Sequence, residues 1–98
     1  MLVVPHKIEG TVVAYSEAGN VVTDIPLEKL ESAPRDPSVA IVCDEHETVG
    51  LFMPDHQEPE FSLLALLAPS GFLELTIVGD SAKAMLGVRV GERVTVKW

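Results

Sequence analysis

The sequence contains little that could support covalent cross-linking or the binding of polyanions. It has a single cysteine, Cys43, in 98 residues, so an internal disulfide is excluded. The 7 Lys and Arg residues are scattered among 15 Asp and Glu residues, which gives a formal net charge of -8. Nucleic acids and anionic membrane surfaces are bound by clustered basic side chains. This charge balance therefore predicts no nucleic-acid partner and no membrane partner.

Long apolar runs are also missing. The longest, residues 63–69, is far below the roughly 20 residues that a membrane-spanning helix needs. Residues 1–5 lack the basic start, the longer apolar stretch and the small-residue cleavage site of a secretion signal. We therefore expect a cytoplasmic protein.

The surroundings of Cys43 favour packing over chemistry. The residue ends an apolar run over positions 39–43 and is followed by Asp44 and Glu45. A nucleophilic thiolate needs a base or a positive neighbour, and the two carboxylates oppose thiolate formation. We expect Cys43 to lie in the core.

Hydrophobic residues make up 47% of the chain, enough for one core, and 98 residues are too few for two. We therefore treat residues 1–98 as a single domain. Short runs with period two, separated by turn residues every eight to twelve positions, predict an all-β barrel or sandwich. Two hairpins are expected. In the first, strands 8–16 and 21–25 flank the turn 17–20. In the second, strands 39–43 and 48–53 flank the acidic turn 44–47.

Three further strands are expected in the second half of the chain. Residues 61–68 form an unbroken apolar run, typical of a strand buried on both faces, although periodicity alone also allows a short helix. Residues 72–78 carry Leu73, Leu75 and Ile77 on one face, and residues 93–98 alternate in the same way.

Two short helical segments are expected beside the strands. The first covers residues 27–30, with Asp24 or its neighbour as cap and Pro26 in the first turn. The second covers residues 81–86, with Asp80 or Ser81 as N-cap and Gly87 as the stop.

Acidic residues and histidines form the one pattern that could hold a metal: Asp44 to Glu47, then Asp55 and His56. A strand over residues 48–53 would separate the two groups by roughly 20 Å, so we predict a solvated turn and no metal site. No motif places a catalytic nucleophile, and the glycines are isolated, without a phosphate-binding loop. We predict no catalytic residue in this chain.

Two segments, residues 10–25 and 69–94, carry a specific resemblance. Their motifs are Gly19-Asn20-x-x-Thr23, then about fifty residues later Ser70-Gly71-x-Leu73-Glu74, and Ser81-Ala82-x-x-x-Leu86-Gly87. In this order and spacing the chain resembles the C-terminal β-barrel domain of the S-adenosyl-L-methionine (SAM) hydroxide adenosyltransferases, the family that includes the fluorinating and chlorinating enzymes.

The resemblance implies a small closed Greek-key barrel of about seven strands. In the family this barrel follows a larger N-terminal α/β domain that holds the nucleophile, and trimers form their sites between the two kinds of domain. The resemblance thus implies two kinds of partner: an α/β protein, and further copies of this chain in a homotrimer. SAM or adenosine is the implied ligand, and the barrel alone is not expected to be a complete enzyme.

The same resemblance implies site residues. Asn20 matches the asparagine that hydrogen-bonds adenine, and the backbone at Val78 and Gly79 matches the segment that also contacts the adenine edge. An aromatic residue that stacks on adenine is expected at Phe52 or His56.

On the methionine side, Ser70 and Gly71 match the loop at the carboxylate. Ser16 stands where the family pattern Asp-x-Phe-Gly-Asn has an acidic residue, so the anchor for the methionine ammonium is displaced or lost. The chain also lacks the arginine found at the Ser70 position in halogenating members.

Three functions stay open on the sequence. The first is a separately encoded barrel that supplies the adenine-side wall of an adenosyl pocket to an α/β partner. The second is a structural or oligomer-forming barrel without ligand, in which the turn glycines and Asn20 serve the fold alone. The third is autonomous hydrolysis of SAM, which one barrel surface does not favour because it lacks a second wall to close the site.

Overall fold

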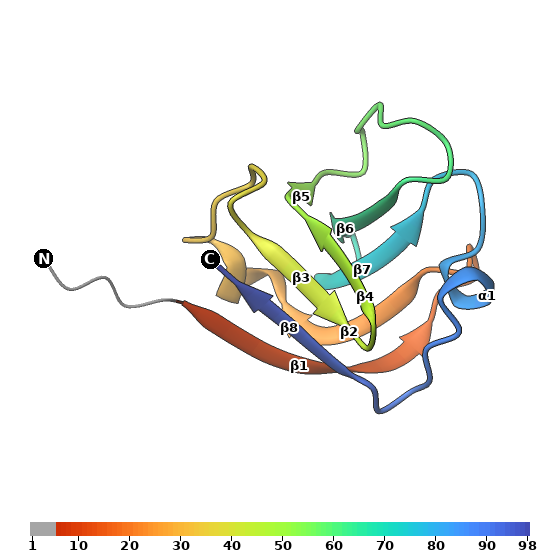
Figure 1. The fold of residues 1–98 in the computed structure, drawn as a ribbon, viewed down its shortest axis with the longest axis horizontal. Helices are drawn as coiled ribbons and strands as arrows, with labels where there is room; N and C mark the ends of the chain where they lie inside the picture. The colour runs from red at the N-terminus through yellow and green to blue at the C-terminus, as the bar shows by residue number, and fades with distance from the viewer. Residues whose placement is uncertain (1–5) are drawn as a thin grey trace, which may run out of the picture.

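The protein folds into a single antiparallel-rich sheet that curls into a nearly closed barrel (Figure 1). The computed structural model describes residues 6–98, so the prediction made for residues 1–5 lies outside the described part. The strand order in the sheet is β4-β3-β8-β1-β2-β7-β6-β5. The elements are β1 (Lys7–Tyr15), β2 (Val21–Pro26), η1 (Leu27–Leu30), β3 (Ala40–Cys43), β4 (His46–Val49), β5 (Leu51–Phe52), β6 (Leu63–Leu67), β7 (Phe72–Ile77), α1 (Ala82–Leu86) and β8 (Arg93–Lys97).

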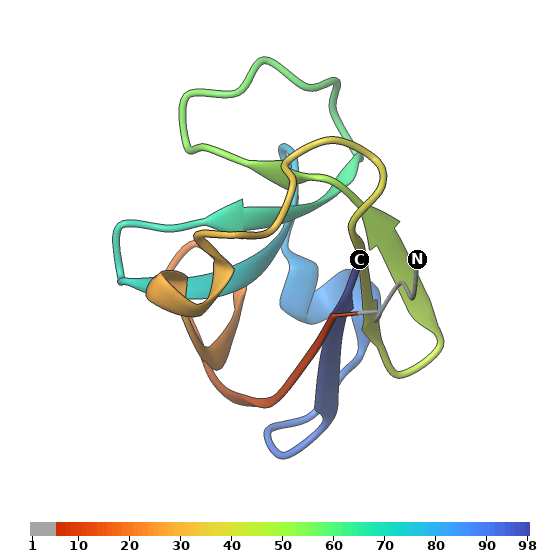
Figure 2. The same ribbon diagram turned by 90° about the vertical axis from the view of Figure 1, so that its left-hand side faces the viewer.

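Gly50 explains both the closure of the barrel and the eighth strand. The expected strand 48–53 is interrupted at Gly50, whose φ of +85° favours glycine. The chain crosses there from β4, at one edge of the sheet, to β5, at the other edge, where β5 pairs in parallel with β6. The Thr48 hydroxyl also donates to the Leu63 carbonyl at 2.7 Å and so links β4 at one edge to β6, the strand next to the other edge. The view turned by 90° shows the strands curling around a common centre (Figure 2).

The core consists of the inward-facing residues of the alternating strands, as the sequence predicts. Leu73 and Leu75 of β7 are at most 2% exposed, and Ile77 is also buried. On β8, Val94 and Val96 are fully buried, while Arg93 and Lys97 are exposed. On β6, Leu64, Ala65 and Leu66 are all buried, so this strand is covered on both faces and the helical alternative is wrong.

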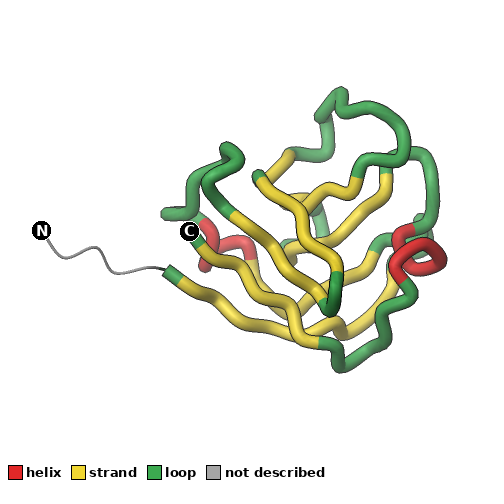
Figure 3. The backbone as a smooth tube through the Cα atoms, in the orientation of Figure 1, coloured by secondary structure: helices red, strands yellow, loops and turns green. Residues whose placement is uncertain are grey.

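The two helical segments lie at opposite ends of the barrel (Figure 3). At α1, the Ser81 side chain accepts a hydrogen bond from the Ala84 N–H, and Gly87 ends the helix with a left-handed φ of +66°. Both features confirm the prediction for 81–86. The capping role predicted for Asp24 is wrong: Pro26 is the N-cap of η1, and Asp24 instead accepts the Thr11 N–H at 2.8 Å, between β1 and β2.

Cys43 lies in the core and is 1% exposed. Burial raises the pKa of its thiol to about 11, with smaller contributions from the carboxylates of Glu92 and Asp44. The turn after it is shorter than expected, because His46 and Glu47 already belong to β4. Among residues 6–98, neither helical segment has the length and apolar character required to cross a membrane.

Candidate functional site

The turn between β1 and β2 holds Asn20 in place. The Ser16 N–H donates to the Asn20 carbonyl at 2.9 Å, and the Asn20 N–H donates back to Ser16 Oγ at 3.0 Å. Gly19 adopts a φ of +86°, and its carbonyl accepts the Lys83 N–H at 2.8 Å, in the first turn of α1. A Cβ at Gly19 would lie 2.5 Å from Ser81 Oγ, so only glycine fits between the turn and the helix.

A hydrogen-bonded chain of four side chains runs along the outer face of β7. It comprises Asn20, Ser70, Glu74 and Thr76, and we call it the Asn20–Glu74 network. The Thr76 hydroxyl donates to Asn20 Oδ1 at 2.7 Å, and Asn20 Nδ2 donates to Glu74 Oε1 at 3.1 Å. The Ser70 hydroxyl donates to Glu74 Oε2 at 2.7 Å. The network therefore connects the turn at residue 20 with the turn at residue 70.

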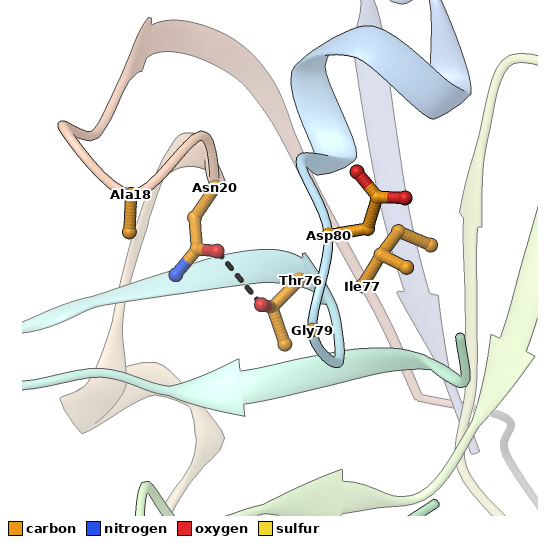
Figure 4. Close-up of a pocket in the computed structure, with 6 residues that line it drawn as sticks. All are labelled: Ala18, Asn20, Thr76, Ile77, Gly79 and Asp80. Carbon is orange, nitrogen blue, oxygen red and sulfur yellow. Dashed lines mark hydrogen bonds between the residues drawn. The ribbon is translucent and has the colours of Figure 1, made fainter. Parts of the chain in front are cut away.

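A surface hollow of about 450 Å³ lies at one end of this network. Its lining consists of Ala18, Asn20, Thr76, Ile77, Gly79 and Asp80. In Figure 4 the Asn20 amide and the Thr76 hydroxyl point toward one another, and the side chains of Ile77 and Asp80 point away from them. The hollow is open to solvent on one side, so these residues form a wall and not an enclosed cavity.

The structure brings two of the predicted adenine-side residues, Asn20 and Gly79, to this hollow. Val78 is next to it, but its backbone is already used: its N–H donates to the Ser62 carbonyl at 3.0 Å, and its carbonyl accepts the Phe61 N–H at 2.8 Å. Of Val78 and Gly79, only Gly79 is part of the lining of the hollow.

On the predicted methionine side, Ser70 is tied into the network through Glu74. Gly71 forms the turn before β7, with a φ of +89°, and its carbonyl accepts the Leu27 N–H at 3.0 Å. The Ser16 hydroxyl oxygen accepts the Asn20 N–H. This hydrogen bond helps to hold Asn20 in place in the turn.

The predicted aromatic residues do not reach the hollow. Phe52 lies on β5, and its ring meets the His56 ring edge-on, with centroids 6.4 Å apart. His56 Nδ1 accepts the Glu58 N–H at 3.1 Å. Neither ring is part of the lining, so the hollow has no aromatic platform from the described residues 6–98.

The acidic turn brings Asp44, Glu45 and His46 together, with potential ligand atoms within 4.8 Å of one another. Asp55 and His56 do not join this group. The His46 ring nitrogen Nε2 lies 2.9 Å from the Leu86 carbonyl, which positions this ring against the end of α1. The two carboxylates are exposed. These contacts give the turn a structural role.

Two residues of the network, Glu74 and Thr76, were missed as site residues by the sequence reasoning. Their signal was present: they are polar residues at alternate positions of a strand whose intervening side chains are core residues. Alternation shows that both face outward, but it does not show that Asn20 lies beside them. The pairing of Val21 with Leu75 brings them together, because it places the preceding Asn20 next to Thr76.

Fold and hollow together define a small Greek-key β-barrel module with a surface hollow beside the Asn20–Glu74 network. The sequence matches the C-terminal domain of SAM hydroxide adenosyltransferases over residues 10–95. The chain therefore belongs to this domain family, as the motifs around Asn20 and Ser70 indicated. No curated protein is similar enough to this chain to count as a match.

Two solved structures share the fold. An uncharacterised conserved protein from Thermotoga maritima is 25% identical, with a TM-score of 0.72 over 92% of this chain and 35% of its own. A conserved hypothetical protein from Thermus thermophilus is 22% identical, with a TM-score of 0.70 over 90% of this chain and 34% of its own. The chain thus spans about a third of each relative.

Proposed function

We propose that this barrel supplies the adenine-side wall of an adenosyl-binding site, which an α/β domain or partner protein completes. The observation that carries the proposal is the presence of Asn20 and Gly79 on one hollow, with the Asn20 amide held by Thr76 and Glu74. An asparagine amide pairs well with adenine, because it offers both a donor and an acceptor to the base edge. After its two network bonds, Asn20 retains one N–H and one oxygen lone pair for a ligand.

The charge of the chain also supports SAM as the ligand. SAM carries a sulfonium and an ammonium cation beside one carboxylate and so has a net positive charge, which a chain with a net charge of -8 attracts. Glu74 adds a carboxylate near the hollow, and among residues 6–98 the ion pairs involve Glu9 alone, with Lys7 and Arg93. No cationic side chain of the described residues therefore pairs with Glu74.

The open shape of the hollow supports a binding role without catalysis. Chemistry on SAM requires a positioned nucleophile and exclusion of bulk water. The hollow is lined on one side only, and its side chains, within the part of the chain that is described, include neither a thiol nor an imidazole. This chain spans only about a third of each relative of known structure, which leaves room in them for a second wall. We assign the nucleophile and the closure of the site to the partner.

Calorimetry tests the proposal. The chain is titrated with SAM and with adenosine, alone and together with a candidate α/β partner. We expect weak or no heat for the barrel alone and a clear heat of binding with the partner. Asn20→Ala should abolish that heat, whereas Gln57→Ala, which removes the other carboxamide of the chain at an exposed loop position, should leave it unchanged.

The absence of heat under both conditions would contradict ligand binding. In that case the oligomeric state decides the second function. A stable trimer, measured by light scattering, would support a barrel that serves assembly alone.

A further inference from the structure

Glu74 is buried, and no cationic side chain of residues 6–98 pairs with it. Burying such a carboxyl group costs free energy unless other contacts compensate. Glu74 is 6% exposed. Its cross-strand neighbours on the same face of the sheet are Val22 of β2 and Leu66 of β6. A polar group in such surroundings is tolerated only when it is hydrogen-bonded. Both carboxylate oxygens satisfy this condition, through Asn20 Nδ2 and the Ser70 hydroxyl.

These bonds determine which way the Asn20 amide faces. A carboxylate oxygen accepts hydrogen bonds, so the amide nitrogen must face Glu74. The Thr76 hydroxyl then donates to Asn20 Oδ1 from the other side. A flipped amide would place Oδ1 against Oε1, two acceptors without a proton between them. Glu74 thereby leaves Asn20 with one orientation.

We infer that Glu74 is a positioning residue that makes the hollow selective for a 6-aminopurine over a 6-oxopurine. The inference rests on the proposed function and deepens it. With the amide held, Oδ1 is presented on the Thr76 side of the hollow as an acceptor. The 6-amino group of adenine can donate to it, whereas the 6-oxo group of hypoxanthine would place two acceptors face to face. A purine that offers the wrong group leaves polar atoms of the site unpaired.

The choice of Glu over Gln at position 74 is the step that can be tested. A glutamine has the same shape but carries both an acceptor and a donor on its terminal group. If the substituted glutamine turned its amide nitrogen toward Asn20, the Asn20 amide could flip, and the rotatable hydroxyls of Ser70 and Thr76 could follow. Glu74→Gln therefore keeps the network satisfied in two orientations, and the flipped one suits a 6-oxo group.

Nuclear magnetic resonance can observe this amide directly, because the chain contains one asparagine, Asn20, and one glutamine, Gln57. The ¹⁵N-labelled full chain therefore has two side-chain NH₂ pairs, and Glu74→Gln adds a third. Adenosine and inosine are titrated separately, with and without the α/β partner, into wild-type protein, Glu74→Gln and the control Glu47→Gln. Glu47 is an exposed residue of β4 outside the network, so the control makes the same chemical change elsewhere.

In the wild type and in Glu47→Gln, we expect the Asn20 NH₂ pair to respond to adenosine with at least about tenfold tighter binding than to inosine. In Glu74→Gln the ratio should fall to within about threefold, mainly because inosine binds better. The ligand-free spectrum of this variant should also show a shifted or doubled Asn20 NH₂ pair, with backbone signals outside the network unchanged.

The outcomes separate the inference from the proposed function. If adenosine and inosine bind the wild type equally, the inference is overturned while adenosine binding stands. An unchanged Asn20 NH₂ pair and an unchanged ratio in Glu74→Gln also overturn it, because Glu74 then does not hold the amide. If neither nucleoside shifts any signal, with or without the α/β partner, the proposed function fails, and the selectivity inference fails with it.

Discussion

Two polar clusters on the outside of the barrel differ in almost every physical respect. On β1 and β8, Glu9 pairs with Lys7 at 3.0 Å and with Arg93 at 3.1 Å, and these three side chains are 41–73% exposed. On β7, the Asn20–Glu74 network is held together by hydrogen bonds among neutral groups and the Glu74 carboxylate. Glu74 itself is only 6% exposed. Opposite charges in water contribute little to stability, whereas a partly buried network depends on every member. The contrast indicates where a substitution should matter.

The largest expected effect concerns the turn that positions the network. Gly19→Ala should lower the free energy of unfolding by about 3 kcal/mol, because it adds left-handed strain and a clash with Ser81 at the start of α1. Gly91→Ala is the matched control: Gly91 also has a positive φ, of +97°, but nothing lies within 4 Å of the added Cβ. Urea unfolding should show about 1 kcal/mol for the control. Equal losses for the two variants would show that the clash has no influence.

The second effect breaks the network itself. Glu74→Ala should lower the free energy of unfolding by about 2 kcal/mol, because the Asn20 amide and the Ser70 hydroxyl lose their acceptor. Chemical denaturation measures the loss, and the side-chain NH₂ signals of Asn20 should broaden at the same time. A variant as stable as the wild type would indicate that water replaces the carboxylate without cost, and the two clusters would then be equivalent.

The third effect concerns the core, where Cys43 on β3 pairs with Val94 of β8, the strand that also carries Arg93 of the exposed cluster. Because burial raises the pKa of the Cys43 thiol to about 11, native protein should resist alkylation at pH 8, and protein unfolded in urea should react readily. The sign for stability follows from the same shift. Below the unfolded thiol's pKa of about 9 both states hold the proton; as pH rises toward 11 the unfolded state loses it first, so stability falls. Native labelling as fast as unfolded labelling would refute the burial.

The smallest effect is expected at the exposed cluster. Lys7 and Arg93 hold the pKa of the Glu9 carboxyl below its usual range, with the hydrogen bond from Lys7 as the main cause. Any stability from this shift is present above the ordinary pKa and is lost as pH falls. Since the Glu9 side chain is exposed, Glu9→Gln should unfold at the same urea concentration as the wild type at pH 7, with or without added salt at about 1 M. A clear loss of stability that added salt abolishes would show that the exposed cluster also contributes to stability, as the Asn20–Glu74 network does.

Much of the fold was predictable from alternation and turn chemistry. Leu73, Leu75 and Ile77 share the inward face of β7 because side chains alternate along a strand, and this pattern depends on the sequence alone. Ser81 and Gly87 limit α1 because a hydroxyl caps the free N–H groups and glycine accepts a positive φ. The prediction for Asp24 failed because its carboxylate had a long-range donor, the Thr11 N–H on β1, which local sequence rules do not include.

The site was predictable only in part. Asn20 and Gly79 were identified through the family resemblance, and the structure places both at one hollow. Phe52 and His56 were expected at the adenine as well, but the chain crosses the barrel at Gly50 and takes them away from the hollow lining. Glu74 belongs to one of the family motifs but was not recognised as a partner of Asn20, because 54 residues separate the two along the chain.

By itself, the sequence determined the all-β class, the inward faces of the strands, the ends of α1 and the burial of Cys43. These properties follow from side-chain polarity and from backbone preferences of neighbouring residues. Only the tertiary structure decided that Asn20, Ser70, Glu74 and Thr76 form one network beside a hollow, and that the sheet closes through Gly50. Strand register and sheet closure bring distant residues together, and both depend on the packing of the whole barrel.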